Sequence, residues 1–167
     1  AFEPQPNIFN VLKRNSSLNG SGIRCEQLAL SNSKGELPFY NYGAGAFSTN
    51  NTTAGSLNPK WRPTGQQHIT VPVTTLKAYL ESQTIDKVDL MKVDVETFEP
   101  EVLEGYGSLI SKHRPVIIME IQNPEIGMRI SALLEDSSYT FFHLHEEEGM
   151  RQVDALGEFE EFRNYLL

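Results

Sequence analysis

Three charged residues stand at every second position in the segment DLMKVDVETFEPEVLEG. Lys92, Asp94 and Glu96 alternate with apolar residues, so their side chains should point to one side while the strand persists. A lysine inside such a strand is costly unless it is paired, and Asp94 is its expected partner. The cluster could bind the amino end of a ligand, orient a hydroxyl group or take its proton. It could equally be an ion-paired strand end that precedes a helix.

Two further polar positions follow predicted strands. Glu3 stands in the opening AFEP, and Ser31 ends the run IRCEQLALS. Because ligands of open α/β sheets bind beyond the carboxyl ends of the strands, both positions are candidates for a site. An ionised carboxylate is acceptor-only and can take both hydroxyl groups of a ribose. Glu3 is therefore a candidate for ribose binding, with a surface glutamate near a frayed terminus as the alternative.

The elements that would position these residues alternate along the chain. Periodicity and turn residues predict strands at 23–31, 37–42, 68–73, 88–93, 116–121 and 139–143, and helices at 7–18, 75–82, 98–111 and 124–134. The tail EFEEFRNYLL fits either a helix or a terminal strand. This alternation indicates an α/β fold, a three-layer sheet with parallel strands, and 167 residues suit a single domain over 1–167.

A long polar segment, residues 43–66, interrupts this alternation. It is rich in Gly, Ser, Thr and Asn and is too long for an idle connection, which predicts a lid or a binding loop. Gly43 and Gly45 form a GxG without the third glycine of a dinucleotide-binding turn, so we interpret them as a flexible turn.

Composition excludes several classes of protein. The net charge of -8 argues against a nucleic-acid partner, and no run approaches the roughly 18 apolar residues that a membrane span needs. A single cysteine, Cys25, excludes an internal disulfide and any multi-cysteine metal site, which fits a reducing cytoplasm. His143 and His145 share a strand face but lack further ligands at suitable spacing, so we expect no metal site there.

Taken in order and spacing, AFEP, the ALS step and DLMKVDVETFEPEVLEG with RPVIIMEI resemble the FkbM-type methyltransferases. The resemblance covers residues 1–121 well and the remainder loosely. It implies a Rossmann-like class I methyltransferase fold, S-adenosylmethionine as the cofactor, and O-methylation of a small molecule such as a sugar or natural-product hydroxyl.

The resemblance also implies a role for each matching residue. Glu3 would hold the ribose hydroxyl groups of S-adenosylmethionine, while Leu30 and Ser31 would border its adenine. Asp94 would lie beside the methionine end of the cofactor.

On the substrate side, the resemblance implies that Asp94 and Glu96 lie beside the hydroxyl group of the acceptor. Lys92 would orient these two carboxylates, and Glu120 would end its strand on the same rim. In-line methyl transfer depends on holding the nucleophile and methyl group in line, with a base to take the proton.

The sequence departs from the family pattern in two places. Thr97 stands where the family usually has glycine, so we expect the turn after Glu96 to avoid a backbone geometry that only glycine tolerates. The glycine-rich loop of the first strand is also absent from this chain, so the domain is expected to lack its first strand and helix.

The missing loop leaves alternatives open. One is a non-catalytic binding or assembly module with the same fold, whose central strand comes from a partner or from a second copy in a homo-oligomer. A nicotinamide dehydrogenase also uses an acidic residue after its second strand. The KVDVE segment gives no support to this alternative, which we rank last.

Overall fold

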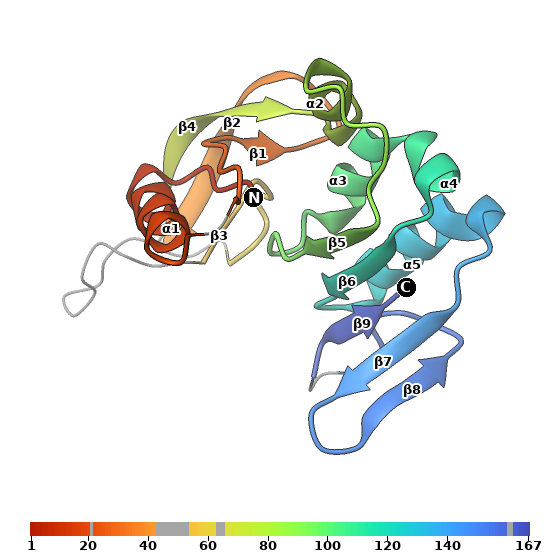
Figure 1. Ribbon diagram of the computed structural model, residues 1–167. Coiled ribbons are helices and arrows are strands. Elements are labelled where there is room, and N and C mark those ends of the chain that lie inside the picture. Colours follow the sequence, from red (N-terminus) through yellow and green to blue (C-terminus); the bar gives the residue numbers. More distant parts are fainter. Residues whose placement is uncertain (21, 43–53, 63–65, 160–161) are drawn as a thin grey trace.

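The computed structural model describes residues 1–20, 22–42, 54–62, 66–159 and 162–167 (Figure 1). Its strands are β1 (Ala29–Leu30), β2 (Gly35–Tyr42), β3 (Gly55–Ser56), β4 (Gln66–Thr74), β5 (Leu90–Val93), β6 (Val116–Glu120), β7 (Phe141–His145), β8 (Gly149–Val153) and β9 (Asn164–Leu166). Its helices are α1 (Pro6–Leu18), α2 (Leu76–Ser82), α3 (Glu99–Tyr106), α4 (Leu109–His113) and α5 (Pro124–Leu134), followed by the short 3-10 turn η1 (Glu135–Ser137). The expected α/β fold class is confirmed, with the described strands divided between two sheets.

The first sheet has the strand order β1-β4-β2-β3. Its centre is the antiparallel pair β2 and β4, in which Tyr40 lies opposite His68, and β1 runs parallel to β4. An isolated parallel bridge between Phe2 and Glu26 joins the opening residues to the segment that precedes β1. Phe39, Val71 and other buried residues form the small core of this sheet.

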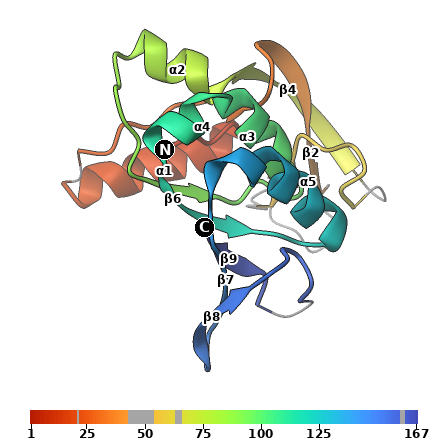
Figure 2. The same cartoon turned by 90° about the vertical axis from the view of Figure 1, so that its right-hand side faces the viewer.

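The second sheet has the strand order β5-β6-β9-β7-β8. β5 and β6 are parallel, and the remaining pairs are antiparallel. β6 follows Pro115 as a run of apolar residues. Ile117 and Met119 share one face of the strand and are fully buried, whereas Val116 on the other face is 46% exposed. The hairpin of β7 and β8 extends away from the helices (Figures 1 and 2).

The main core lies between the second sheet and helices α2, α3, α4 and α5. α3 packs against α5 and also contacts β1 of the first sheet, so it bridges the two halves of the molecule. The close packing depends on Gly105, because a Cβ atom there would lie 2.0 Å from the carbonyl oxygen of Ser31.

A cleft of about 1200 Å³ separates the two sheets. The opening residues line one wall and β5 lines the other. β5 pairs with β6 along one edge, and within the described part of the chain no strand pairs with its other edge, where Leu90 is 61% exposed. The expectation that a first strand and helix belong to this fold stays a prediction.

Most predicted elements are present, with shifted ends. The strand predicted at 23–31 is regular only over Ala29–Leu30, and the helix predicted at 98–111 divides at Gly107, whose positive φ of 58° ends α3. The ambiguous tail forms the strand β9 rather than a helix. Of the polar segment 43–66, residues 54–62 and 66 are described and include β3; the Gly43–Gly45 turn lies outside the described residues.

Candidate active site

The candidate residues gather at the cleft between the sheets. Glu3 and Leu30 line its first wall, and Lys92, Asp94 and Glu96 line its second. β5 ends at Val93, so the last two acidic residues lie just beyond its carboxyl end. This is the position at which open α/β sheets bind ligands.

Lys92 and Asp94 form the ion pair that the sequence predicts. The Lys92 ammonium lies 2.5 Å from a carboxylate oxygen of Asp94, and both side chains are about half exposed at 57% and 42%. Val93, between them, is buried in the core. The alternation of β5 therefore places both charged side chains on the solvent side of the strand.

The backbone turns sharply after the ion pair. Glu96 has a φ of 55° and Thr97 a φ of 73°, both in the left-handed region. The expectation that the turn at Thr97 avoids a geometry favouring glycine is therefore wrong. Local contacts hold the threonine in place, because its N–H donates to Glu99 Oε1 at 3.2 Å and its hydroxyl accepts from Asn58 Nδ2 at 2.8 Å.

The turn brings the Glu96 carboxylate to the end of β6. There the amide of Gln122 donates a hydrogen bond to Glu96 Oε2. Gln122 follows β6 by two residues, and sequence reasoning missed it. Its place two residues after the strand end at Glu120 is the signal that could have drawn attention to it.

Glu120, at the end of β6, adds a third carboxyl group. Burial raises its pKa, and a hydrogen bond to Asp94 together with the negative charges of Asp94 and Glu96 raises it further, against an opposing effect of Arg163. Its neighbours thus favour a proton on Glu120 that Asp94 can accept as a hydrogen bond. Glu120 thus lies beside the other two carboxylates, although it is not among the residues that line the cleft.

Glu3 lies on the opposite wall, where its N–H donates to the carbonyl oxygen of Glu26 at 3.0 Å. Its Oε1 accepts a hydrogen bond from the N–H of Gln5 at 2.7 Å. Burial raises the pKa of Glu3, and this hydrogen bond opposes the rise. A half-buried carboxylate at a strand end has the acceptor capacity that ribose hydroxyl groups require.

Leu30 and Ser31 are arranged differently. Leu30 is half-buried and faces the cleft, whereas Ser31 is fully buried and is not among the residues that line it. The N–H of Ser31 donates to the carbonyl oxygen of Thr74, which joins the end of β1 to the end of β4. Ser31 thus supports the strand end that carries Leu30.

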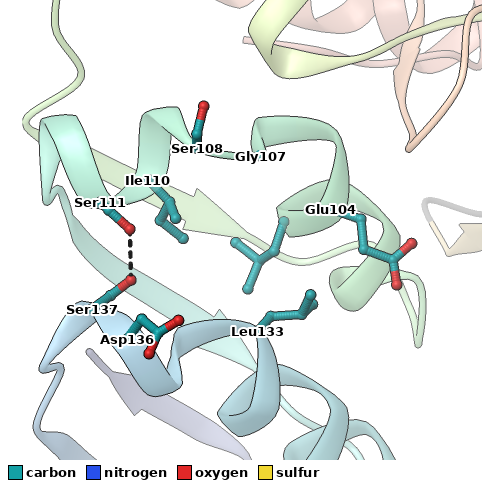
Figure 3. Close-up of a pocket in the computed structure, with 9 residues that line it drawn as sticks. Glu104, Gly107, Ser108, Ile110, Ser111, Leu133, Asp136 and Ser137 are labelled. Carbon is teal, nitrogen blue, oxygen red and sulfur yellow. Dashed lines mark hydrogen bonds between the residues drawn. The ribbon is translucent and has the colours of Figure 1, made fainter.

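A second hollow, of about 380 Å³, lies between α3, α4 and α5 (Figure 3). The hydroxyl groups of Ser111 and Ser137 are hydrogen-bonded across it at 3.0 Å. None of the residues that the sequence singles out for chemistry lines this hollow.

Within the described ranges, no cluster of three or more His, Cys, Asp or Glu side chains is arranged to hold a metal ion. Nor is any described helix both long enough and apolar enough to cross a membrane.

Two known methyltransferases are similar in sequence to this chain. Methyltransferase sdnD of Sordaria araneosa is 31% identical over 163 residues, which is 83% of this chain and 63% of that protein. Hexuronic acid methyltransferase AglP of Haloferax volcanii is 29% identical over 119 residues, which is 71% of this chain and 45% of that protein. The chain thus spans less than two thirds of the length of either relative.

No solved structure matches the chain at a significant level. The family model of the methyltransferase FkbM domain, however, matches residues 1–166, nearly the whole chain. Together with the α/β fold, this match confirms the resemblance that the FEP and KVDVE segments indicate. The chain belongs to the FkbM family of methyltransferases.

Proposed function

We propose that the chain transfers a methyl group from S-adenosylmethionine to a hydroxyl oxygen of a small molecule, a sugar or a natural product. The observation that carries the proposal is the gathering of Glu3, Leu30, Lys92, Asp94 and Glu96 on one cleft. Its volume of about 1200 Å³ exceeds the 300–1,000 Å³ of common ligand pockets and leaves room for a cofactor and an acceptor together. The name of the relative AglP, a hexuronic acid methyltransferase, supports a sugar as the acceptor class.

The residues of the first wall fit the nucleoside part of such a cofactor. The Glu3 carboxylate would accept hydrogen bonds from the ribose hydroxyl groups, and Leu30 offers an apolar surface to adenine, with Ser31 fixing its strand end. On the second wall, the Asp94 carboxylate would attract the amino group of the methionine part. When bound, the cofactor supplies an electrophilic methyl group on a sulfonium sulfur.

Glu96 is the residue we assign as the base. Its carboxylate would take the hydroxyl proton while the hydroxyl oxygen bonds to the methyl carbon and the carbon–sulfur bond breaks, the electron pair remaining on sulfur. Gln122 holds the carboxylate through its amide, and Lys92 orients Asp94 through their ion pair. These residues thereby contribute the alignment on which an in-line displacement depends.

Calorimetric titration with S-adenosylhomocysteine tests the cofactor assignment. We expect the chain to bind it, and Glu3→Gln and Asp94→Asn each to bind at least about tenfold more weakly, because each loses a charged hydrogen-bond acceptor worth about 1.5–3 kcal/mol. Glu36→Gln, at an exposed carboxylate of β2, is the matched control and should bind like the unmodified chain.

The melting temperatures of all three variants should stay close to that of the unmodified chain, which separates lost affinity from unfolding. Unchanged affinity in both Glu3→Gln and Asp94→Asn would refute the assigned roles. Failure of the unmodified chain to bind would instead favour the non-catalytic assembly module.

A further inference from the structure

The left-handed turn between β5 and α3 directs the Glu96 side chain. It contains Glu96 at a φ of 55° and Thr97 at a φ of 73°. This conformation costs of the order of 1–3 kcal/mol for a residue such as threonine, and it persists only where the surroundings fix it. The groups that fix the turn therefore determine where the Glu96 carboxylate lies.

Glu99 is the first of these groups. Its side chain is fully buried at the start of α3. Oε1 accepts hydrogen bonds from the backbone N–H of Thr97 at 3.2 Å and of Val95 at 3.3 Å, so one oxygen ties together both sides of the turn. The other oxygen, Oε2, is buried and has no hydrogen-bond partner among the described residues.

The second group of contacts comes from β3 and the residues that follow it. The Ser56 hydroxyl donates to the carbonyl oxygen of Glu96 at 2.6 Å, and the Asn58 amide donates to the Thr97 hydroxyl at 2.8 Å. Asn58 also accepts, at its carbonyl oxygen, a hydrogen bond from the N–H of Trp61 at 3.1 Å. The turn is thus connected directly to the segment 54–62 of the first sheet.

We propose that Glu99 is a positioning residue, which fixes the turn that carries Glu96 and links it through Ser56 and Asn58 to the segment that carries Trp61. Its carboxylate contacts the turn, not the cleft, so it acts on the reaction through Glu96. The effect on methyl transfer rests on the proposed function, whereas the link between Glu99 and Trp61 does not.

The protonation of Glu99 offers a way to observe this link. Burial raises the pKa of Glu99 to about 7, with a smaller contribution from the charge of Asp94, while hydrogen bonds from backbone N–H groups oppose the rise. Asp94, paired with Lys92, is the charged neighbour at the end of β5, and Glu96 lies within the turn. Ser56 and Asn58, which reach the turn from the other sheet, are uncharged.

Fluorescence of Trp61 tests the proposal without requiring a cofactor or activity. Trp61 is the single tryptophan of the chain and is 5% exposed, so its emission reports on the segment 54–62. We expect a pH-dependent change in its emission with a midpoint near 7 in the unmodified chain, and loss of that change in Glu99→Gln. Glu101→Gln is the matched control on the same helix, where Glu101 is paired with Arg129, and should keep the change.

Two outcomes would overturn the proposal. One is an emission change near pH 7 that survives in Glu99→Gln, since a group other than Glu99 would then be its source. The other is an unmodified chain without any such change. Ser56→Ala provides a second test should Glu99→Gln fail to fold. It leaves Glu99 in place but removes the hydroxyl that bonds to Glu96, one of the two contacts that form the link, so it should reduce the change, and an undiminished change would refute the coupling.

Discussion

Replacement of Glu99 by glutamine should remove a pH dependence of folding stability of about 2–3 kcal/mol between about pH 5 and about pH 8. The carboxyl group has an ordinary pKa of 4.5 and a pKa of about 7 in the folded chain, because it is buried. Between these values the folded chain binds more protons at this position than the unfolded chain, so the free energy of unfolding falls as pH rises. At about 1.36 kcal/mol per pKa unit, the full effect is about 3 kcal/mol, most of it within this pH interval.

The assay is urea unfolding followed by circular dichroism at both pH values, for the unmodified chain and for Glu99→Gln. Other titrating groups contribute equally to the two proteins, so the difference between their pH dependences isolates Glu99. Glu101→Gln, whose carboxyl group is ion-paired with Arg129, should behave like the unmodified chain. The reasoning is refuted if Glu99→Gln keeps the pH dependence of the unmodified chain. It is also refuted if the free energy of unfolding of the unmodified chain, relative to that of Glu99→Gln, increases as pH rises.

Three substitutions test the packing that positions the site. Gly105→Ala should lower the free energy of unfolding by about 2 kcal/mol or more, because its Cβ would lie 2.0 Å from a carbonyl oxygen at the end of β1. Gly22→Ala is the control and should leave the free energy of unfolding unchanged, because a Cβ there would have no atom within 4 Å. Met119→Ala, at a fully buried position of β6, should cost about 2–5 kcal/mol, against less than about 0.5 kcal/mol for Met128→Ala, which is 67% exposed. Asn123→Ala removes the cap that accepts the Ile126 N–H at 3.0 Å and should cost about 1 kcal/mol. Chemical denaturation measures all of them.

Local signals in the sequence were enough to predict the helices closest to the site. α5 begins at Pro124 after the capping residue Asn123, and α2 begins after Thr75, whose hydroxyl accepts from the N–H of Ala78. Both starts were predictable because a cap and a proline act within one turn of helix. The break at Gly107 was missed, since the apolar periodicity continues across it into α4.

The parts of the site that depend on contacts distant in sequence were not predictable in this way. Lys92 and Asp94 pair as neighbours on one strand, and the sequence predicted that pair. Ser56 and Asn58 reach the turn after β5 from about 40 residues away, as given by the separations of 40 and 39 in their hydrogen bonds. No periodicity encodes such a contact, because it depends on how the two sheets pack against each other.

Thr97 illustrates the same limit at a single residue. From sequence, a threonine in place of a glycine predicts an ordinary backbone conformation, because a β-branched side chain is unfavourable at positive φ. The structure has it at 73°, with its N–H bonded to Glu99 and its hydroxyl bonded to Asn58. A side chain that glycine lacks thus supplies a contact that offsets part of the strain.

Two unfavourable local features come together in the segment between β5 and α3. Residues 96 and 97 are both left-handed, and Glu99 buries a carboxyl group whose second oxygen lacks a described partner. A glycine at position 97 would relieve the strain at that residue, whereas an apolar residue at position 99 would leave the N–H groups of Val95 and Thr97 without their acceptor. Strain and buried charge that persist together are expected where the geometry of a site is under selection. Because the segment lies at the carboxyl end of β5 and carries Glu96 into the cleft, this convergence supports the assignment of catalysis to this turn, and not to the helical hollow beside α4.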